Sequence, residues 1–498
     1  MNHEYIMAID QGTTGSRAMV VNSKGEVVSN AYKEFPQIYP MPGWVEHDPE
    51  VIWETTLSVM KQSMDKAAIG SDNIRAIGIT NQRETTVLWD KNTLKPIGNA
   101  IVWQCRRSSS ICDDLKRQGL SPLFQEKTGL VIDAYFSATK IKWMLDNIAD
   151  ARKRARAGEI AFGTIDSWLI AKLTKGKVHV TDYTNASRTL IFNIHEKEWD
   201  TELLGIFDIP VEMLPRVVPS SGVAGQTDPS ILGTAIPIAG IAGDQQAALF
   251  GQACFDKGQV KNTYGTGCFM LLNLGDASVK PTNGLLLTLA CNAEGKPCYA
   301  LEGSVFIAGA VIQWLRDGLG LIESAAQSQD IAMLVEDTGG VYLVPAFAGL
   351  GAPYWDMYAR GAITGITRST TKAHIVRAAL EGIAYQVKDL TQAFEETTGE
   401  MLTELRVDGG ASRNDLLMQF QSDILGIPVD RSSYIESTGM GAAFLAGLST
   451  GMWESGNEIK ALRATERRFE PSITQGKRDE LYAGWLDAVE RVKSGRNI

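Results

Sequence analysis

The chain reads Ile9-Asp10-Gln11-Gly12-Thr13-Thr14-Gly15-Ser16-Arg17 close to its N-terminus, and the related stretch Asn262-Thr263-Tyr264-Gly265-Thr266-Gly267-Cys268-Phe269 follows about 250 residues later. Strand-forming residues flank both stretches, and the Gly and Thr residues between them suit a tight hairpin turn. The exposed amides and hydroxyls of such a turn bind anions. We therefore expect two similar domains that hold a nucleoside triphosphate from opposite sides, with the reaction site between them. The alternative is a pair of ordinary hairpins.

The length and composition favour a globular protein with more than one domain. A chain of 498 residues is too long for one ordinary core, and two large domains fit best. We place the boundary near residue 250, which gives an N-terminal domain over residues 1–250 and a C-terminal domain over residues 251–498. The net charge of −10 argues against a nucleic-acid partner, because proteins that neutralise phosphates generally present a basic face.

Several features indicate a cytoplasmic protein without stable membrane association. Residues 1–10 enter a predicted strand and lack the basic, apolar and cleavage segments of an export signal. The longest apolar stretch, residues 231–242, contains Pro237 and is well short of the ~20 residues that span a bilayer. The six cysteines lack Cys-x-x-Cys spacing, which suits reduced thiols. The histidines are scattered singly, so zinc is not expected.

The order of predicted elements is that of an α/β protein with mixed sheets. Residues 5–35 read as three strands, Asp48 and Pro49 begin a helix as N-cap and first helical residue, and residues 74–80 form the next strand. The second half repeats this outline. We expect its strands near 258–274, 285–302, 341–345 and 404–408, and its helices over 307–319 and 372–397.

Asp10 is a candidate metal ligand. It directly precedes the first Gly-Thr turn, so its carboxylate would repel bound phosphates unless a divalent cation lay between them. Mg²⁺ meets that need, because it binds one or two carboxylates together with substrate phosphates. A role as a simple turn former is the alternative. The Walker sequence Gly-x4-Gly-Lys-[Ser/Thr] is absent, which excludes the P-loop fold as the phosphate cradle.

Two further Gly-containing turns lead into predicted helices. Asp408-Gly409-Gly410 joins a strand to a helix over residues 416–425, a geometry in which helix N-terminal amides meet a phosphate or nucleoside. Asp244 stands in the first turn of another helix, after Gly243. Stabilisation of that helix through its dipole is the alternative role for Asp244.

Arg83 and Glu84 are adjacent opposite charges that follow a predicted strand. As an exposed ion pair they would contribute little. In a cleft they would offer donors and an acceptor to a polyhydroxyl substrate, and Trp103 and Tyr135 could cover its carbon side. Each of these aromatic residues, taken alone, also suits a core.

Taken together, these stretches resemble the FGGY carbohydrate kinases. The segment from Tyr135 through Ser137, Lys140 and Trp143 to Asn147 fits the first motif of that family, and residues 361–366 with 374–381 fit the second. The resemblance extends from residue 5 to about residue 490. It implies an actin-like ATPase fold built from two ribonuclease-H-like domains.

Members of this family that phosphorylate glycerol resemble the chain most closely. The resemblance implies transfer of the ATP γ-phosphoryl group to glycerol in glycerol uptake and catabolism, with Asp244 as general base, Mg²⁺ near Asp10 and a homodimeric or homotetrameric enzyme. It implies glycerol contacts by Arg83, Glu84, Trp103, Tyr135, Asp244, Gln245 and Phe269. It implies ATP contacts by Thr13, Thr14, Gly15, Arg17, Thr266, Gly309, Gln313, Gly410 and Asn414. Gly15 departs from many of these members, which have Ser there.

Three other functions are alternatives to glycerol phosphorylation: a pentulose kinase, an actin-like filament protein and a chaperone ATPase. A pentulose kinase would need a larger cleft than Trp103 and Phe269 suggest. An actin-like filament protein or a chaperone ATPase shares the fold. A chaperone would need a client-binding domain, for which no residues are left over, and neither function explains the adjacent Arg83 and Glu84.

The stretch over residues 224–236 predicts weak regulation. In some bacterial relatives this loop binds the inhibitor fructose 1,6-bisphosphate through an Arg nine residues before the catalytic Asp, and Ala235 occupies that position here. No Lys, Arg or His lies between Val217 and Lys257, so a charge-assisted donor and a phosphorylatable His are both missing. We expect fructose 1,6-bisphosphate, titrated at saturating substrate, to leave the activity nearly unchanged. Half-inhibition at micromolar concentration would contradict this hypothesis.

Overall fold

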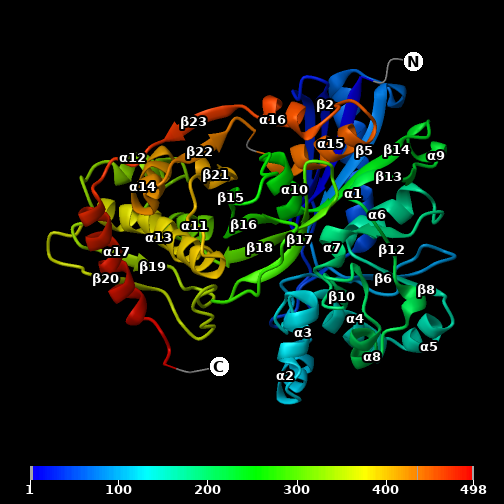
Figure 1. The fold of residues 1–498 in the computed structure, drawn as a ribbon, viewed down its shortest axis with the longest axis horizontal. Helices are drawn as coiled ribbons and strands as arrows, with labels where there is room; N and C mark the ends of the chain where they lie inside the picture. Colours follow the sequence, from blue (N-terminus) through cyan, green and yellow to red (C-terminus); the bar gives the residue numbers. More distant parts are fainter. Residues whose placement is uncertain (1–3, 435, 496–498) are drawn as a thin grey trace.

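The computed structural model describes residues 4–434 and 436–495, which form two halves, each built around a mixed β-sheet (Figure 1). In the first sheet the strand order is β13-β14-β5-β1-β2-β3. The bounds are β1 (Tyr5–Gln11), β2 (Gly15–Asn22), β3 (Val27–Glu34), β5 (Ile74–Asn81), β13 (Ser221–Gln226) and β14 (Pro237–Gly243). Strand β1 pairs antiparallel with β2 and parallel with β5, which pairs parallel with β14.

The second sheet repeats this pattern, with the order β17-β18-β16-β15-β21-β22-β23. Its strands are β15 (Val260–Tyr264), β16 (Cys268–Gly275), β17 (Leu286–Cys291), β18 (Pro297–Val305), β21 (Leu405–Asp408), β22 (Val429–Ser432) and β23 (Thr465–Phe469). Strand β15 pairs antiparallel with β16 and parallel with β21, as β1 does with β2 and β5. Antiparallel strands β13 and β23 close corresponding edges.

The shared order of antiparallel and parallel strands defines two ribonuclease-H-like halves of an actin-like ATPase fold. This confirms the predicted α/β fold class. The proposed division near residue 250 lies between β14 and β15, and it stays a prediction.

Helices surround both sheets. In the first half they are α1 (Pro49–Ala67), α2 (Ser109–Arg117), α3 (Ser121–Thr128), α4 (Ser137–Asn147), α5 (Ala151–Arg156), α6 (Ile165–Leu173), α7 (Tyr183–Ala186), α8 (Thr201–Phe207), α9 (Pro229–Leu232) and α10 (Asp244–Gly251). In the second half they are α11 (Gly309–Asp317), α12 (Gln327–Ala332), α13 (Lys372–Thr398), α14 (Asp415–Leu425), α15 (Ser437–Ser449), α16 (Gly456–Leu462) and α17 (Gln475–Glu490). None of the helices in the described ranges combines the length and apolar character that crossing a bilayer requires.

Short elements complete the fold. The remaining strands are β4 (Glu46–His47), β6 (Val87–Asp90), β7 (Ala100–Ile101), β8 (Ile160–Gly163), β9 (Val180–Asp182), β10 (Phe192–Asn193), β11 (Glu198–Trp199), β12 (Arg216–Val218), β19 (Tyr342–Val344) and β20 (Ala362–Thr364). The 3₁₀ turns within the described residues are η1 (Ser71–Asn73), η2 (Val211–Met213) and η3 (Gly410–Arg413). The predicted start of α1 is confirmed, because the Asp48 carboxylate accepts the Glu50 amide at 2.9 Å and Pro49 follows.

Helices α10 and α15 pack against each other between the two sheets (Figure 1). Although α15 comes late in the chain, it packs on β1, β5 and β14 of the first sheet. Glycines allow this close approach. A Cβ on Gly441 would lie 1.8 Å from the Ala247 carbonyl oxygen, and one on Gly78 would lie 2.0 Å from that of Ala442. Backbone therefore touches backbone at the joint between the halves.

This contact predicts that Gly441→Ala destabilises the protein. The added methyl group must push α15 away from α10, and overpacking of this kind costs about 1–3 kcal/mol. The measurement is the urea midpoint of unfolding, with Gly205→Ala in α8 as the matched control. A Cβ on Gly205 meets nothing within 4 Å, so that helix substitution is neutral or stabilising. Equal midpoints for the two variants would show that the close contact does not limit packing.

Candidate active site

The Arg83-Glu84 pair lies in a turn directly after β5, between the two halves of the molecule. Arg83 is 2% exposed and Glu84 is 1% exposed, so the alternative of an exposed surface ion pair is wrong. Glu84 has a φ of 59°, in the left-handed region that non-glycine residues rarely occupy. Such backbone strain persists only where the surrounding contacts hold it.

Arg83 joins the first half of the chain to the second. Its Nη1 and Nη2 donate to the two carboxylate oxygens of Glu302 on β18, at 2.5 and 3.1 Å. Its Nε lies 3.1 Å from Oδ1 of Asp244 at the start of α10. Nη1 also donates to the Gln246 side chain at 3.2 Å. A two-pronged guanidinium–carboxylate contact of this kind fixes direction as well as charge.

A second arginine completes the buried network. Arg188 follows α7, and it donates to Glu84 at 2.6 Å and to Glu302 at 2.9 Å. Burial alone would raise the pKa of Glu302, but Arg188 and Arg83 hold that pKa at about 2. Burial raises the pKa of Glu84 despite the same two arginines. Sequence analysis missed Glu302 and Arg188, although a lone Glu in the apolar run of β18 was a usable signal.

Two aromatic residues stand beside Arg83. The rings of Trp103 and Tyr135 meet edge to face, with centroids 5.5 Å apart, and both side chains are partly exposed. The Tyr135 hydroxyl lies 3.5 Å from Arg83 Nη2. Trp103 Nε1 donates to the Thr13 hydroxyl at 2.9 Å, which ties this aromatic wall to the first hairpin turn.

Asp244 is accessible from one side. Its side chain is 32% exposed, whereas its neighbours in the network are almost fully buried. Oδ1 accepts the Gln245 amide at 2.7 Å in addition to the contact with Arg83. The preceding residue, Gly243, donates its amide to the Thr184 hydroxyl at 2.8 Å. The carboxylate therefore lies in the first turn of α10 and also belongs to the charged network.

Asp10 lies one residue before the end of β1, beside the first hairpin turn. Burial raises its pKa to about 7; Arg17 opposes that shift, and Glu436 and Asp244 add to it. Arg17 forms an ion pair with Glu436. A carboxylate held near a second one fits Mg²⁺, which takes few protein ligands and completes its shell with phosphates and water. The described residues contain no group of three or more His, Cys, Asp or Glu side chains that could hold a metal ion.

A backbone hydrogen bond closes each of the two predicted phosphate turns. The Gly12 amide donates to the Gly15 carbonyl at 2.9 Å, and the Gly265 amide donates to the Gly267 carbonyl at 2.9 Å, so the second turn is one residue shorter than the first. Thr14 and Thr266 are exposed on these turns. At Gly15 an added Cβ would lie 2.6 Å from the Tyr32 hydroxyl, so Tyr32 occupies the space that a larger residue there would need.

The predicted nucleotide residues of the second half gather around the second turn. The Gly309 amide, at the start of α11, donates to the Gly265 carbonyl at 2.9 Å. Gln313 is exposed one turn further along this helix. Gly409 lies against the Tyr264 backbone, which brings Gly410 close to the turn. Asn414 caps α14 by accepting the Leu417 amide at 3.0 Å.

The stretch over residues 224–236 has cationic neighbours that the linear sequence does not show. Asp228 caps α9 and lies 3.0 Å from Lys177 and 3.7 Å from Lys175. Both lysines contact this one carboxylate, so its single negative charge balances only one of their two positive charges. The expectation of insensitivity to a bisphosphate stays a prediction.

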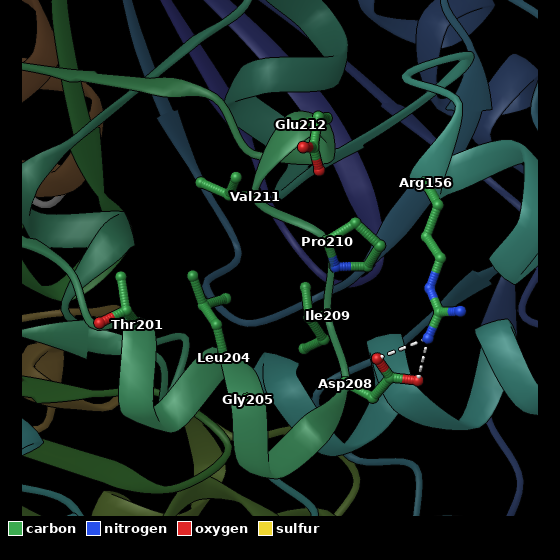
Figure 2. A pocket seen from close by; sticks show the side chains of 9 residues that line it. All are labelled: Arg156, Thr201, Leu204, Gly205, Asp208, Ile209, Pro210, Val211 and Glu212. Carbon is green, nitrogen blue, oxygen red and sulfur yellow. Dashed lines mark hydrogen bonds and ion pairs between the residues drawn. The ribbon is translucent and has the colours of Figure 1, made fainter.

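A separate surface hollow of about 340 Å³ lies between α5 and α8 (Figure 2). Its lining residues are Arg156, Thr201, Leu204, Gly205, Asp208, Ile209, Pro210, Val211 and Glu212. Figure 2 shows Arg156 turned toward the Asp208 carboxylate, which it contacts at 2.9 Å. None of the predicted substrate or nucleotide residues borders this hollow.

Models of one protein family match both halves of the chain. The model of the N-terminal domain of the FGGY family of carbohydrate kinases matches residues 5–251, and that of the C-terminal domain matches residues 260–450. The chain is 61% identical over 489 residues to a protein named glycerol kinase from Caldanaerobacter subterraneus subsp. tengcongensis, with 98% of each chain covered. It is 59% identical over 488 residues to a protein named glycerol kinase 2 from Thermotoga maritima, again with 98% of each covered. The chain belongs to the FGGY family of carbohydrate kinases.

Solved structures agree with this assignment. The crystal structure of Plasmodium falciparum glycerol kinase with ADP matches with a TM-score of 0.93 at 38% identity, covering 100% of this chain and 99% of that one. A ligand-bound xylulose kinase from Lactobacillus acidophilus matches with a TM-score of 0.88 at 23% identity, covering 99% of each chain. The second likeness shows a shared fold alone.

The buried network predicts a large stability loss for Arg188→Met. Removal of this guanidinium takes away the cation that contacts Glu84 at 2.6 Å and Glu302 at 2.9 Å, and breaking a buried ion pair costs about 3–5 kcal/mol. Arg117→Met is the control, because Arg117 pairs with Asp114 on the exposed face of α2. Urea unfolding should show a much lower midpoint for the first variant and no measurable change for the second. Similar midpoints would mean that the network does not stabilise the fold.

Proposed function

We propose that this kinase transfers the γ-phosphoryl group of ATP to a terminal hydroxyl of glycerol and forms sn-glycerol 3-phosphate. The observation that carries the proposal is the buried Arg83–Glu84 turn with Asp244 beside it and Trp103 and Tyr135 along one side. Relatives named glycerol kinase, about 60% identical over nearly the whole chain, support the choice of substrate.

Arg83 and Glu84 are the proposed hydroxyl contacts. Arg83 offers N–H donors, and its contacts with Glu302 and Asp244 fix the orientation of its guanidinium group. Glu84 offers an acceptor that Arg188 holds in place. A small polyol then lies with its hydroxyls toward these charges and its carbon side toward Trp103, Tyr135 and Phe269. Gln245 is a further proposed contact.

Asp244 is the proposed general base. Its Oδ1 is occupied by Arg83 Nε and by the Gln245 amide, so Oδ2 is the oxygen left to accept the proton of the attacking hydroxyl. Phosphoryl transfer proceeds through a loose transition state, so most of the rate comes from alignment and charge stabilisation. General base catalysis adds a factor of about 10²–10⁴.

ATP is proposed to bind between the two turns. Thr13, Thr14, Gly15 and Arg17 contribute from the first half, and Thr266, Gly309, Gln313, Gly410 and Asn414 contribute from the second. Asp10 is the proposed ligand of Mg²⁺, which when bound neutralises phosphate charge. The ionised Asp10 carboxylate binds the ion, and the exposed hydroxyls of Thr14 and Thr266 offer hydrogen bonds to phosphate oxygens.

We further infer a cytoplasmic homodimer or homotetramer. All six cysteines are free and buried, which suits a reducing compartment. Size-exclusion chromatography with light scattering measures the oligomeric state, and a monomeric mass would contradict this inference.

The substrate is tested by ADP release with glycerol, dihydroxyacetone, xylulose and gluconate in parallel. We expect the highest kcat/KM with glycerol and a product that matches sn-glycerol 3-phosphate. A higher kcat/KM with xylulose or gluconate would contradict the proposed substrate.

The base is tested by Asp244→Asn. The amide keeps the size of the side chain and an oxygen for Arg83 but cannot accept the proton, so we expect kcat to fall about 10²-fold or more. ADP binding, measured by calorimetry, should stay within about twofold, since Asp244 is not among the proposed ATP contacts. A variant with nearly full kcat would remove Asp244 from the role of base.

A further inference from the structure

Lys261 is a buried cation that the proposed mechanism does not use. It lies on β15, at the joint between the two halves, and is 0% exposed. Its Nζ donates to the Gln245 Oε1 atom at 2.6 Å, to the Thr263 hydroxyl at 2.9 Å and to the Phe269 carbonyl at 3.3 Å. Gln245 belongs to α10, whereas Thr263 and Phe269 belong to the β15–β16 hairpin.

The contact with Lys261 determines which way the Gln245 amide points. An ammonium group only donates hydrogen bonds, so the amide atom that faces Lys261 must be the oxygen. The NH₂ group of Gln245 then points away from Lys261. Gln245 is 7% exposed, and in residues 4–434 and 436–495 its Nε2 has no hydrogen-bond acceptor. Because the residue is mostly buried and this donor has no protein partner, its N–H groups are suited to a ligand oxygen.

The charges around Lys261 keep it in this position. Asp408 on β21, Asp244 on α10 and Glu302 on β18 attract it, and Arg83 repels it. Burial lowers the pKa of Lys261 to about 8, against the pull of Asp408 and Asp244. Oδ1 of Asp408 is buried without a hydrogen-bond partner among the described residues. The positive charge of Lys261 therefore also compensates the negative charge of the Asp408 carboxylate.

We propose that Lys261 is a positioning residue for the acceptor substrate. It holds the Gln245 amide with its NH₂ group toward the substrate hydroxyl, and it ties the start of α10 to the hairpin that carries Phe269. Lys261 acts through Gln245 and does not itself touch the substrate. This inference rests on the proposed function, because it takes Gln245 as a glycerol contact.

Steady-state kinetics of the full-length enzyme test the inference, with wild type measured first. Lys261→Met removes the donor and Gln245→Leu removes the amide. Each should raise KM for glycerol about tenfold while kcat and KM for ATP stay within about twofold, since the lost contact acts in ground and transition states alike. The double variant should resemble the worse single variant, because both changes remove the same contact. Lys257→Met is the matched control, since Lys257 is half exposed and pairs with Glu400, and it should leave all constants unchanged.

Gln245→Glu keeps the experiment decisive if Lys261→Met does not fold. Glutamate retains an oxygen for Lys261 and has no N–H to offer, so KM for glycerol should again rise about tenfold. An unchanged KM in either Gln245→Glu or Lys261→Met would overturn the proposal, as would additive effects in the double variant. Absence of glycerol-dependent ADP release in the wild type would instead contradict the proposed function.

Discussion

The contact between Arg83 and Glu302 is the interaction on which the site depends. Arg83 comes from the first half of the chain and Glu302 from the second, and both are almost completely buried. A buried charge is tolerated only when it is paired and hydrogen-bonded. Arg83 and Arg188 therefore require Glu302, Glu84 and Asp244, and these carboxylates require the arginines. The turn after β5, which is the proposed binding turn, and the first residue of α10 can take this arrangement only when both halves are folded together.

The duplicated fold explains why charged groups meet at this place. Strand β14 leads into α10 as β22 leads into the segment before α15, and the two helices pack against each other through glycine contacts. In sheets with parallel strands, ligands bind beyond the carboxyl ends of the strands. The turns after β1, β5, β14, β15 and β21 all lie at such ends. The repeat thus brings the two proposed phosphate turns and the proposed polyol turn around a common joint.

The sequence predicted the features that depend on local chemistry. Gly-Thr turns, the Asp48 cap and the alternation of strands and helices follow from short stretches, and the structure shows them near the expected residues. The partners of Arg83 were not predictable in this way, since Glu302 is 219 positions away in the chain. Glu84 is next to Arg83 in the sequence, but its carboxylate is 3.8 Å from Arg83 Nε and 2.6 Å from Arg188. Lys261 was missed because a lone lysine in a strand carries no spacing signal, and the packing of α15 on the first sheet depends on topology alone.

We propose that Asp244 and Arg83 hold one glycerol hydroxyl in line with the nucleotide between the two turns. A crystal structure with glycerol, Mg²⁺ and a non-hydrolysable ATP analogue tests this arrangement. We expect a terminal glycerol hydroxyl about 2.6–3.2 Å from the free oxygen of Asp244, with Arg83 still paired to Glu302. Glycerol bound away from Arg83 and Glu84, or an Asp244 carboxylate turned away from the hydroxyl, would show that the proposed arrangement is wrong.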